Sequence, residues 1–314
     1  MIDSFQSLLV GGDQARKVAA RIGEFDYSCG LPFSVAGFVN PSSPARFQLV
    51  NCGYDWYDVP VYRSLDEVFK SDTKFTLAHG VSKSGPRIED VDSAAILYNA
   101  KHVLFWVQEC LKHLQIKKIT LLAEDVPERD AREIVYLQKK SGVNILGPSS
   151  LGMLIPGRGR LGEIGGDWNN LQKCKLDVHG LVGVITKSGG ISGELMWVVS
   201  QNCPGMSGVF QIGGDAFPAT DFVHWLEYFS HDGETKVVVM AGEAGGNLEE
   251  RAAEWYRDYQ KEKGEGGREK FKLIAVISGK FLEQMPKGQK FGHAGAKQEE
   301  SGFGSAGHGL NPAS

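Results

Sequence analysis

Val182-Gly183-Val184-Ile185-Thr186-Lys187-Ser188-Gly189-Gly190-Ile191-Ser192 joins a short apolar run to a glycine-rich turn. The run from Val182 to Thr186 is apolar with hardly an interruption, which is typical of a strand buried on both faces of a parallel sheet. After the glycines, a helix is predicted to begin near Ser192 and to continue to Val199. A strand, a tight turn and a helix in this order form the basic unit of an α/β fold.

Eight further apolar runs of this kind are spread along the chain. The segments between several of them show helical periodicity, most clearly Ala94 to Leu114 and Ala216 to Phe229. This alternation predicts an α/β protein with doubly wound, largely parallel sheets. The runs expected to be strands are Ser7 to Val10, Val35 to Val39, Phe75 to Ala78, Ile119 to Ala123, Val143 to Leu146, Val209 to Ile212, Val237 to Ala241 and Leu273 to Ile277.

Length and composition narrow the class of protein. With 314 residues, 42% of them hydrophobic, the chain is large enough for two domains. A formal net charge of -4 argues against nucleic acid or an anionic membrane surface as a partner. No apolar run is long enough to span a bilayer, and the N-terminus lacks the layout of a signal peptide. The five cysteines have no metal-type spacing. We therefore expect reduced thiols, no metal site, and a soluble cytoplasmic protein.

The domain boundary is predicted near Gly147-Pro148. The first domain then covers residues 1–147 and the second covers residues 148–300. A glycine-rich stretch from Gly157 to Gly166 opens the second domain and is expected to be poor in strands, before the second set of strands begins. Residues 301–314 are rich in small residues and have little to bury, so a loose tail is expected there.

The turn after the first expected strand is a candidate phosphate-binding loop. It reads Gly11-Gly12-Asp13-Gln14-Ala15-Arg16. Glycines let the backbone approach a phosphate, the following helix offers its N-terminal amides, and Arg16 can add a charge-assisted hydrogen bond. The complete dinucleotide fingerprint is absent, which argues against a nicotinamide cofactor. The residues equally fit a tight turn followed by a surface arginine.

Three more glycine-rich turns follow strands of the second set. They are Lys187-Ser188-Gly189-Gly190, Ile212-Gly213-Gly214-Asp215 and Gly242-Glu243-Ala244-Gly245-Gly246. In open α/β sheets ligands bind at the carboxyl ends of the strands, so these turns are expected to share one site. Glu243 can accept a hydrogen bond from one imidazole nitrogen and leave the other nitrogen as a nucleophile. The alternative is an ordinary carboxylate at a helix N-terminus.

One histidine lies in a loop of small residues near the end of the chain, Phe291-Gly292-His293-Ala294-Gly295-Ala296. Such a loop gives the imidazole little to pack against and leaves room for a bulky group on a ring nitrogen. A phosphoryl group is the leading candidate. The loop therefore indicates a protein that passes phosphate from one reaction to another.

In their order along the chain, these motifs resemble the α subunit of succinyl-CoA synthetase and its relatives. Further details are more similar to the corresponding part of ATP-citrate lyase and citryl-CoA synthetase. These details are Phe25-Asp26-Tyr27-Ser28-Cys29, Ala123-Glu124 with Pro127-Glu128, Gly147-Pro148, and Phe291 before the histidine loop. The resemblance extends from about residue 5 to about residue 300.

This resemblance implies a Rossmann-like CoA-binding domain followed by a flavodoxin-like domain. His293 would be phosphorylated from ATP and Mg²⁺ on a partner, an ATP-grasp subunit, in a hetero-oligomer. The phosphoryl group would activate citrate, and CoA would give citryl-CoA, the precursor of acetyl-CoA and oxaloacetate where a citrate-synthase-like module is present. Glu243 would orient the imidazole. The implied CoA-binding residues are Gly11, Gly12, Gln14, Arg16 and Arg46, and the implied phosphate-binding residues are Ser188, Gly189, Gly190, Gly213, Gly214, Gly292 and Gly295.

The chain also departs from the pattern of this family, most clearly at Lys187 and after the histidine loop. Lys187 stands where the lyases usually have arginine, so a point charge replaces a fork-shaped donor. After the histidine loop only Lys297 to Ser314 follow, where the relatives continue further. Two alternatives stay open, a succinyl-CoA synthetase α subunit and a catalytically silent CoA-binding or interaction protein.

Overall fold

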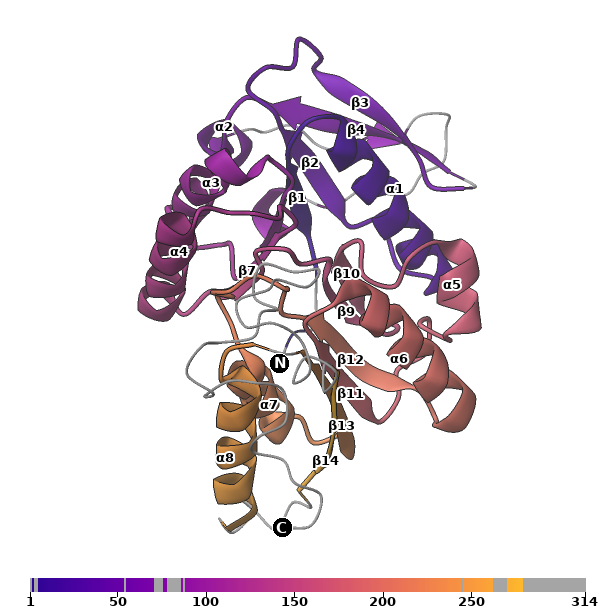
Figure 1. Ribbon diagram of the computed structural model, residues 1–314. Coiled ribbons are helices and arrows are strands. Elements are labelled where there is room, and N and C mark those ends of the chain that lie inside the picture. The colour runs from indigo at the N-terminus through magenta and orange to yellow at the C-terminus, as the bar shows by residue number, and fades with distance from the viewer. Residues whose placement is uncertain are drawn as a thin grey trace.

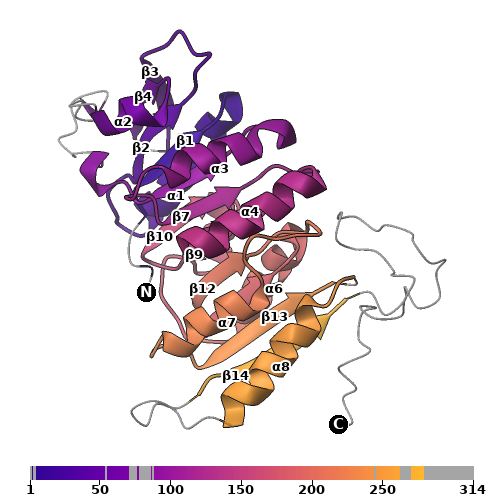
Figure 2. The ribbon, with the colours of Figure 1, turned by 90° about the vertical axis from the view of Figure 1, so that its left-hand side faces the viewer.

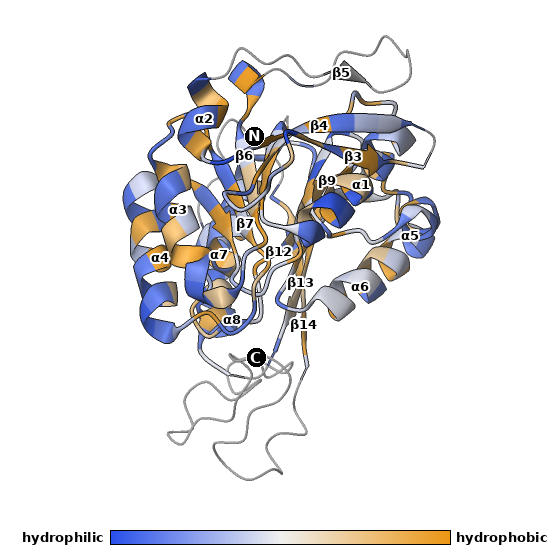
Figure 3. Cartoon of the chain, turned by 90° about the horizontal axis from the view of Figure 1, so that it is seen from above, coloured by the Kyte–Doolittle hydropathy of each residue, from blue (hydrophilic) through white to orange (hydrophobic). Residues whose placement is uncertain are grey.

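The computed structural model describes residues 2, 5–53, 55–70, 76–77, 86, 88–243, 245–261 and 270–278. These residues form two sheets with helices on both faces (Figure 1). Seen from above, α2, α3, α4, α7 and α8 lie on one side of the sheets, and α1, α5 and α6 lie on the other (Figure 3). The predicted α/β architecture is confirmed.

The first sheet is built from the N-terminal half of the chain. Its strands are ordered β3-β4-β2-β1-β6-β7-β8, with β5 paired to β4. The pairs from β4 to β8 along this order are parallel, whereas β3 and β5 each pair antiparallel with β4. The strands are β1 Ser7–Val10, β2 Val35–Val39, β3 Phe47–Asn51, β4 Trp56–Tyr62, β5 Thr76–Leu77, β6 Ser93–Ile96, β7 Lys118–Leu121 and β8 Asn144–Leu146; the helices are α1 Asp13–Ser28, α2 Leu65–Lys70, α3 Val103–Leu111 and α4 Glu128–Ser141, with short 3₁₀ turns at Ile88–Asp90 and Ala100–His102.

The second sheet has the order β10-β9-β12-β11-β13-β14. The neighbours among β11, β12, β13 and β14 are parallel, and the β9–β10 hairpin is antiparallel to β12. The strands are β9 Gly152–Ile155, β10 Gly159–Gly162, β11 Val182–Thr186, β12 Met206–Gln211, β13 Val237–Gly242 and β14 Lys272–Ile277; the helices are α5 Trp168–Lys173, α6 Gly189–Asn202, α7 Phe222–His231 and α8 Leu248–Lys261.

Several expectations drawn from the sequence are wrong. Residues 94–114 are not one helix, because Ser93–Ile96 is a fully buried strand between β1 and β7. Alanine favours helices, but a central position in the sheet overrides that preference here. The stretch 157–166 contains strand β10, which pairs with β9 in the hairpin. Residues 216–221 form a loop, and α7 begins only after Asp221, whose carboxylate caps the helix by accepting from the His224 N–H.

The two sheets are joined by one of the hydrophobic clusters of the described residues. A single cluster of buried side chains contains Phe5 and Leu9 from the first half and Phe210 and Trp225 from the second. The Phe210 and Trp225 rings stack at 4.0 Å between centroids. The side view shows the sheets following one another along the molecule (Figure 2). The division of the chain at residues 147 and 148 stays a prediction.

A buried arginine fixes α1 to the second half of the chain. Arg160 on β10 is fully buried and donates hydrogen bonds to the carbonyl oxygens of Arg21 at 3.1 Å and Gly166 at 3.0 Å. Burial lowers the pKa of its guanidinium to about 10. Because Arg21 belongs to α1, this side chain holds the helix next to β10.

Candidate functional site

Three of the glycine-rich turns meet at one edge of the second sheet. Strands β11, β12 and β13 are parallel neighbours, so their carboxyl ends at Thr186, Gln211 and Gly242 lie side by side. The turns that follow these ends are the ones singled out from the sequence. The expectation that they share one edge is confirmed by the strand order.

Helix α6 begins earlier than the sequence indicated. Its first residue is Gly189 rather than one near Ser192, and Ser188 is the N-cap residue. The Ser188 side chain makes no capping hydrogen bond. Its carbonyl instead accepts from the Ser192 N–H at 3.0 Å and from the Ser192 hydroxyl at 2.8 Å. The first-turn amides have no acceptor within the helix. They are suited to bind an anion.

Both the backbone carbonyl and the side-chain ammonium group of Lys187 have partners, and these contacts fix the start of α6. Its carbonyl oxygen accepts from the Gln211 side-chain amide at 2.7 Å. Its ammonium group lies 2.7 Å from a carboxylate oxygen of Glu249, in the first turn of α8. Both side chains are buried, and the ammonium group is paired with Glu249, although Lys187 also lines the cavity at this edge.

Glu243 follows β13 and lies next to the same carboxylate. The backbone N–H of Glu243 donates to Glu249 Oε1 at 3.0 Å. The Glu243 residue is half-buried and lines a cavity at this edge. Glu243 is therefore a candidate for contact with a ligand in this cavity.

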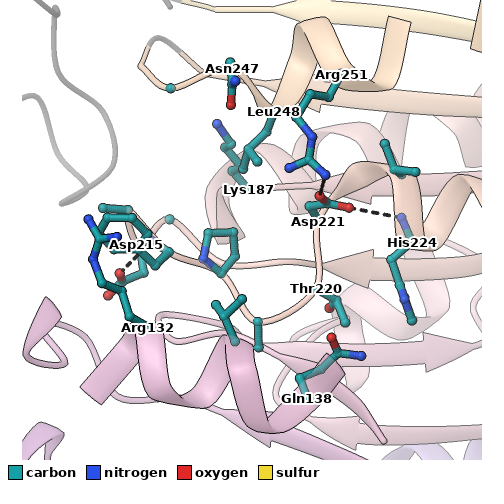
Figure 4. A pocket seen from close by; sticks show the side chains of 18 of the residues that line it. Arg132, Gln138, Lys187, Asp215, Thr220, Asp221, His224, Asn247, Leu248 and Arg251 are labelled. Atoms are coloured by element: carbon teal, nitrogen blue, oxygen red, sulfur yellow. Dashed lines mark hydrogen bonds and ion pairs between the residues drawn. The ribbon is translucent and has the colours of Figure 1, made fainter. Parts of the chain in front are cut away.

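The cavity has a volume of about 900 Å³ and lies between α4 and the beginnings of α7 and α8 (Figure 4). Its wall contains two ion pairs, Arg251–Asp221 at 2.9 Å and Arg132–Glu128 at 2.8 Å. Asp215, which closes the turn after β12, also lines it. Burial raises the pKa of the Asp215 carboxyl.

The glycines after β12 have a structural explanation of their own. Gly213 has a φ of 100°, and a Cβ atom there would collide with the carbonyl oxygen of Pro148. The chain therefore needs glycine at this position because a second backbone segment passes close to it. Gly214 is buried and lines the cavity, so it is the better placed of the two for a ligand contact.

A second candidate site lies at the carboxyl edge of the first sheet. Gly11 follows β1, and a Cβ atom on it would lie 2.9 Å from Leu97 Cβ. Gly12 is the N-cap residue of α1, and it provides no side-chain cap. Gln14 and Arg16 in the first turns of α1 are exposed, and so is Arg46 before β3. Within the described part of the chain neither arginine has an ion-pair partner. Both are available to an anionic ligand.

Some residues of both edges could not be identified from the sequence. Gln211 ties together the ends of β11 and β12, and Glu249 ties together β11 and β13, but neither role has a local signal. Tyr98 follows β6 and lies with its hydroxyl 3.5 Å from the Asn40 side-chain oxygen. Tyr98 could not be identified from the sequence, because the strand before it, β6, was predicted to be part of a helix.

His293, Gly292 and Gly295 lie outside the described residues. Among the residues that are described, no group of three or more histidine, cysteine, aspartate or glutamate side chains could hold a metal ion. Also within the described part, no helix is long and apolar enough to cross a membrane.

The residues at this edge of the second sheet lie in the part of the chain that is similar to a known family. Residues 185–304 match the family described as CoA-ligase. The matched part of the chain contains the turns after β11, β12 and β13.

More particularly, the chain is homologous to part of the ATP-citrate synthases. It is 35% identical over 226 residues to ATP-citrate synthase subunit 1 of Sordaria macrospora, covering 72% of this chain and 32% of that protein. It is 31% identical over 288 residues to the probable ATP-citrate synthase subunit 1 of Schizosaccharomyces pombe, covering 91% of this chain and 43% of that protein. The chain thus spans less than half the length of these relatives.

Solved structures show the same fold. ATP citrate lyase from Methanothrix soehngenii, in complex with citrate and coenzyme A, has a TM-score of 0.81 with this chain at 24% identity. The match covers 97% of this chain and 45% of that one. A dinucleotide-forming acetyl-coenzyme A synthetase from Ca. Korarchaeum cryptofilum has a TM-score of 0.59 at 19% identity, over 88% of this chain and 51% of that one.

Proposed function

We propose that this chain is the phosphohistidine-bearing, CoA-binding part of an ATP-dependent, cytoplasmic citrate-activating enzyme of the acid–CoA ligase type. One observation carries the proposal. The uncapped N-terminus of α6 and Glu243 lie at one edge of a single sheet, within the part of the chain that matches the CoA-ligase family. The homology to ATP-citrate synthases supports citrate as the acid.

The proposed reaction proceeds in three transfers. A nitrogen of the His293 imidazole attacks the γ-phosphorus of ATP, which is bound with Mg²⁺ on an ATP-grasp partner, and ADP leaves. A citrate carboxylate oxygen then attacks the phosphorus, and the N–P bond breaks to give citryl phosphate. The CoA thiolate attacks the acyl carbon, and phosphate leaves as citryl-CoA forms. Covalent catalysis of this kind divides one difficult step into easier ones.

The described residues have distinct roles in this scheme. The α6 amides of Gly189 and Gly190, with the Ser188 hydroxyl, hold the phosphoryl group. The helix dipole adds to their effect. Because the Lys187 ammonium group is paired with Glu249, we assign the phosphoryl contacts to the backbone amides. The Glu243 carboxylate orients the imidazole by accepting its other N–H.

CoA is assigned to the edge of the first sheet. The open N-terminus of α1 at Gly12 and the exposed side chains of Gln14, Arg16 and Arg46 suit its phosphate groups. Arg16 and Arg46 have no ion-pair partner within the described part of the chain, so binding would not require an ion pair to be broken.

The acid substrate is tested by discharge of the labelled protein. The chain is incubated with the ATP-grasp subunit of its own source organism and γ-labelled ATP, then freed of nucleotide. Citrate with CoA is expected to remove the label within one turnover, whereas succinate with CoA leaves it in place. Discharge by succinate alone would favour a succinyl-CoA synthetase role. A chain that never takes up label would contradict both enzymatic roles and favour a silent binding protein.

A further inference from the structure

Glu249 receives donors from two separate turns of the candidate site. Its Oε1 atom lies 2.7 Å from Lys187 Nζ and 3.0 Å from the backbone nitrogen of Glu243. Lys187 precedes the N-cap of α6, and Glu243 follows β13. One carboxylate oxygen on α8 therefore links the two parts of the site that would hold the phosphoryl group and orient the imidazole.

The Glu249 carboxylate lies in a buried position where its neighbours leave space for it. The side chains of Lys187 and Glu249 are only 8% and 6% exposed. A Cβ atom on Gly242 would lie 2.5 Å from Glu249 Cγ and 2.7 Å from its Oε1, so the glycine at the end of β13 leaves the required space. Lys187 Nζ also lies 5.9 Å from the centre of the Phe222 ring.

Stability alone is a weak explanation for this ion pair. Removing two charges from water costs free energy that their attraction often only offsets, and well-packed apolar replacements of buried pairs are frequently neutral or stabilising. A positioning role accounts better for the pair, because its carboxylate also accepts the Glu243 N–H. The positions of α6 and Glu243 then depend on one another.

We propose that Glu249, together with Lys187, is a positioning residue that sets the Glu243 carboxylate against the N-terminus of α6. The inference rests on the proposed function for its consequence in catalysis, and on the contacts alone for its consequence in structure. Misplacement of a reacting group by about 1 Å is enough to slow an enzyme on the order of 100-fold.

The decisive variant is the double substitution Lys187→Met/Glu249→Leu, which keeps apolar volume and removes both charges. Its unfolding free energy is expected to stay close to that of the parent chain. Amide hydrogen exchange at Glu243, measured by NMR or mass spectrometry, is expected to rise at least tenfold. With ATP and the ATP-grasp subunit, phosphorylation is expected to slow on the order of 100-fold in kcat, with KM for ATP unchanged.

Two single variants complete the test. Glu249→Gln keeps an oxygen that accepts the Glu243 N–H, and Glu243 exchange in this variant should stay within threefold of the parent. Glu250→Gln, next in the sequence but outside these contacts, should match the parent in both measurements. Unchanged Glu243 exchange or a parental rate in the double variant would overturn the inference, and so would its failure to fold. If the parent is never phosphorylated, the proposed function fails while the exchange result still decides the positioning role.

Discussion

At the scale of single residues, α6 contains two glycines that the protein's own packing does not explain. A Cβ atom on Gly190 would meet only Ser188 Oγ, at 3.9 Å, and one on Gly193 would meet nothing within 4 Å. Both glycines are in α6, where glycine weakens a helix relative to alanine. The fold alone would favour alanine at both positions.

These two glycines give a matched pair of variants. Gly190→Ala and Gly193→Ala should each raise the free energy of unfolding by up to about 1 kcal/mol, as alanine is the better helix former. Only Gly190→Ala should also slow phosphorylation, by at least tenfold, because the new methyl group occupies the space of the phosphoryl group. Thermal unfolding and label uptake measure the two effects. Equal rates in both variants would contradict a phosphate site at the start of α6.

Asp26 gives a prediction about pH. It is buried and accepts hydrogen bonds from Ser34 N at 2.9 Å and Ser34 Oγ at 2.8 Å. Burial raises the pKa of its carboxyl from 3.8 to about 7. The folded protein therefore holds this proton where the unfolded chain has lost it. The contribution of Asp26 to stability is complete below pH 3.8 and is lost as the pH rises to about 7.

Asp26→Asn keeps an oxygen that accepts the Ser34 N–H and removes the titration. Between pH 4 and pH 7 the unfolding free energy of the parent should fall relative to this variant, by at most about 1.4 kcal/mol per pH unit. Urea unfolding at several pH values measures the difference. Parallel curves for the two proteins would show that Asp26 does not bind this proton in the folded state.

At the scale of elements, the sequence predicts the strongly apolar strands well. It predicts the strand of small residues and the start of helix α6 less well. Val182–Thr186 and Val35–Val39 have the predicted bounds because burial on both faces requires continuous apolar runs. The strand Ser93–Ile96 was not predicted, because its small residues fit a helix equally well. The start of α6 at Gly189 was not predicted either, because glycine is a poor helix former. Gln211 and Glu249 fix that start through contacts that exist only after the strands have aligned.

If CoA binds at the N-terminus of α1, as proposed, its affinity should depend on Arg16. Arg16→Ala is expected to weaken CoA binding about tenfold, because a charge-assisted hydrogen bond to phosphate is lost. Isothermal titration calorimetry at two salt concentrations measures this, and the parent should show the steeper loss of affinity with salt. Arg257→Ala, at an exposed position of α8 in the second half of the chain, is the control. Equal CoA affinity in Arg16→Ala and the parent would remove this helix from the CoA site.

At the scale of the whole molecule, the shared hydrophobic cluster and the buried Arg160 link the two sheets. The shared cluster would keep the proposed CoA site on the first sheet and the proposed phosphate site on the second in a constant relation. The four glycine turns could be identified from the sequence because each directly follows an apolar run. The wall of the cavity could not, because α4 and the loop before α7 are brought together only by the tertiary fold.

The most direct test of the central claim is the rate at which label from ATP reaches His293 in the presence of the ATP-grasp subunit, with the site mapped by mass spectrometry. The parent should carry acid-labile, base-stable label on His293, and His293→Ala should carry none. Glu243→Gln should be labelled on the order of 100-fold more slowly, whereas Glu227→Gln, in the same cavity wall, should keep the parental rate. Label on another residue, or a parental rate in Glu243→Gln, would contradict the account.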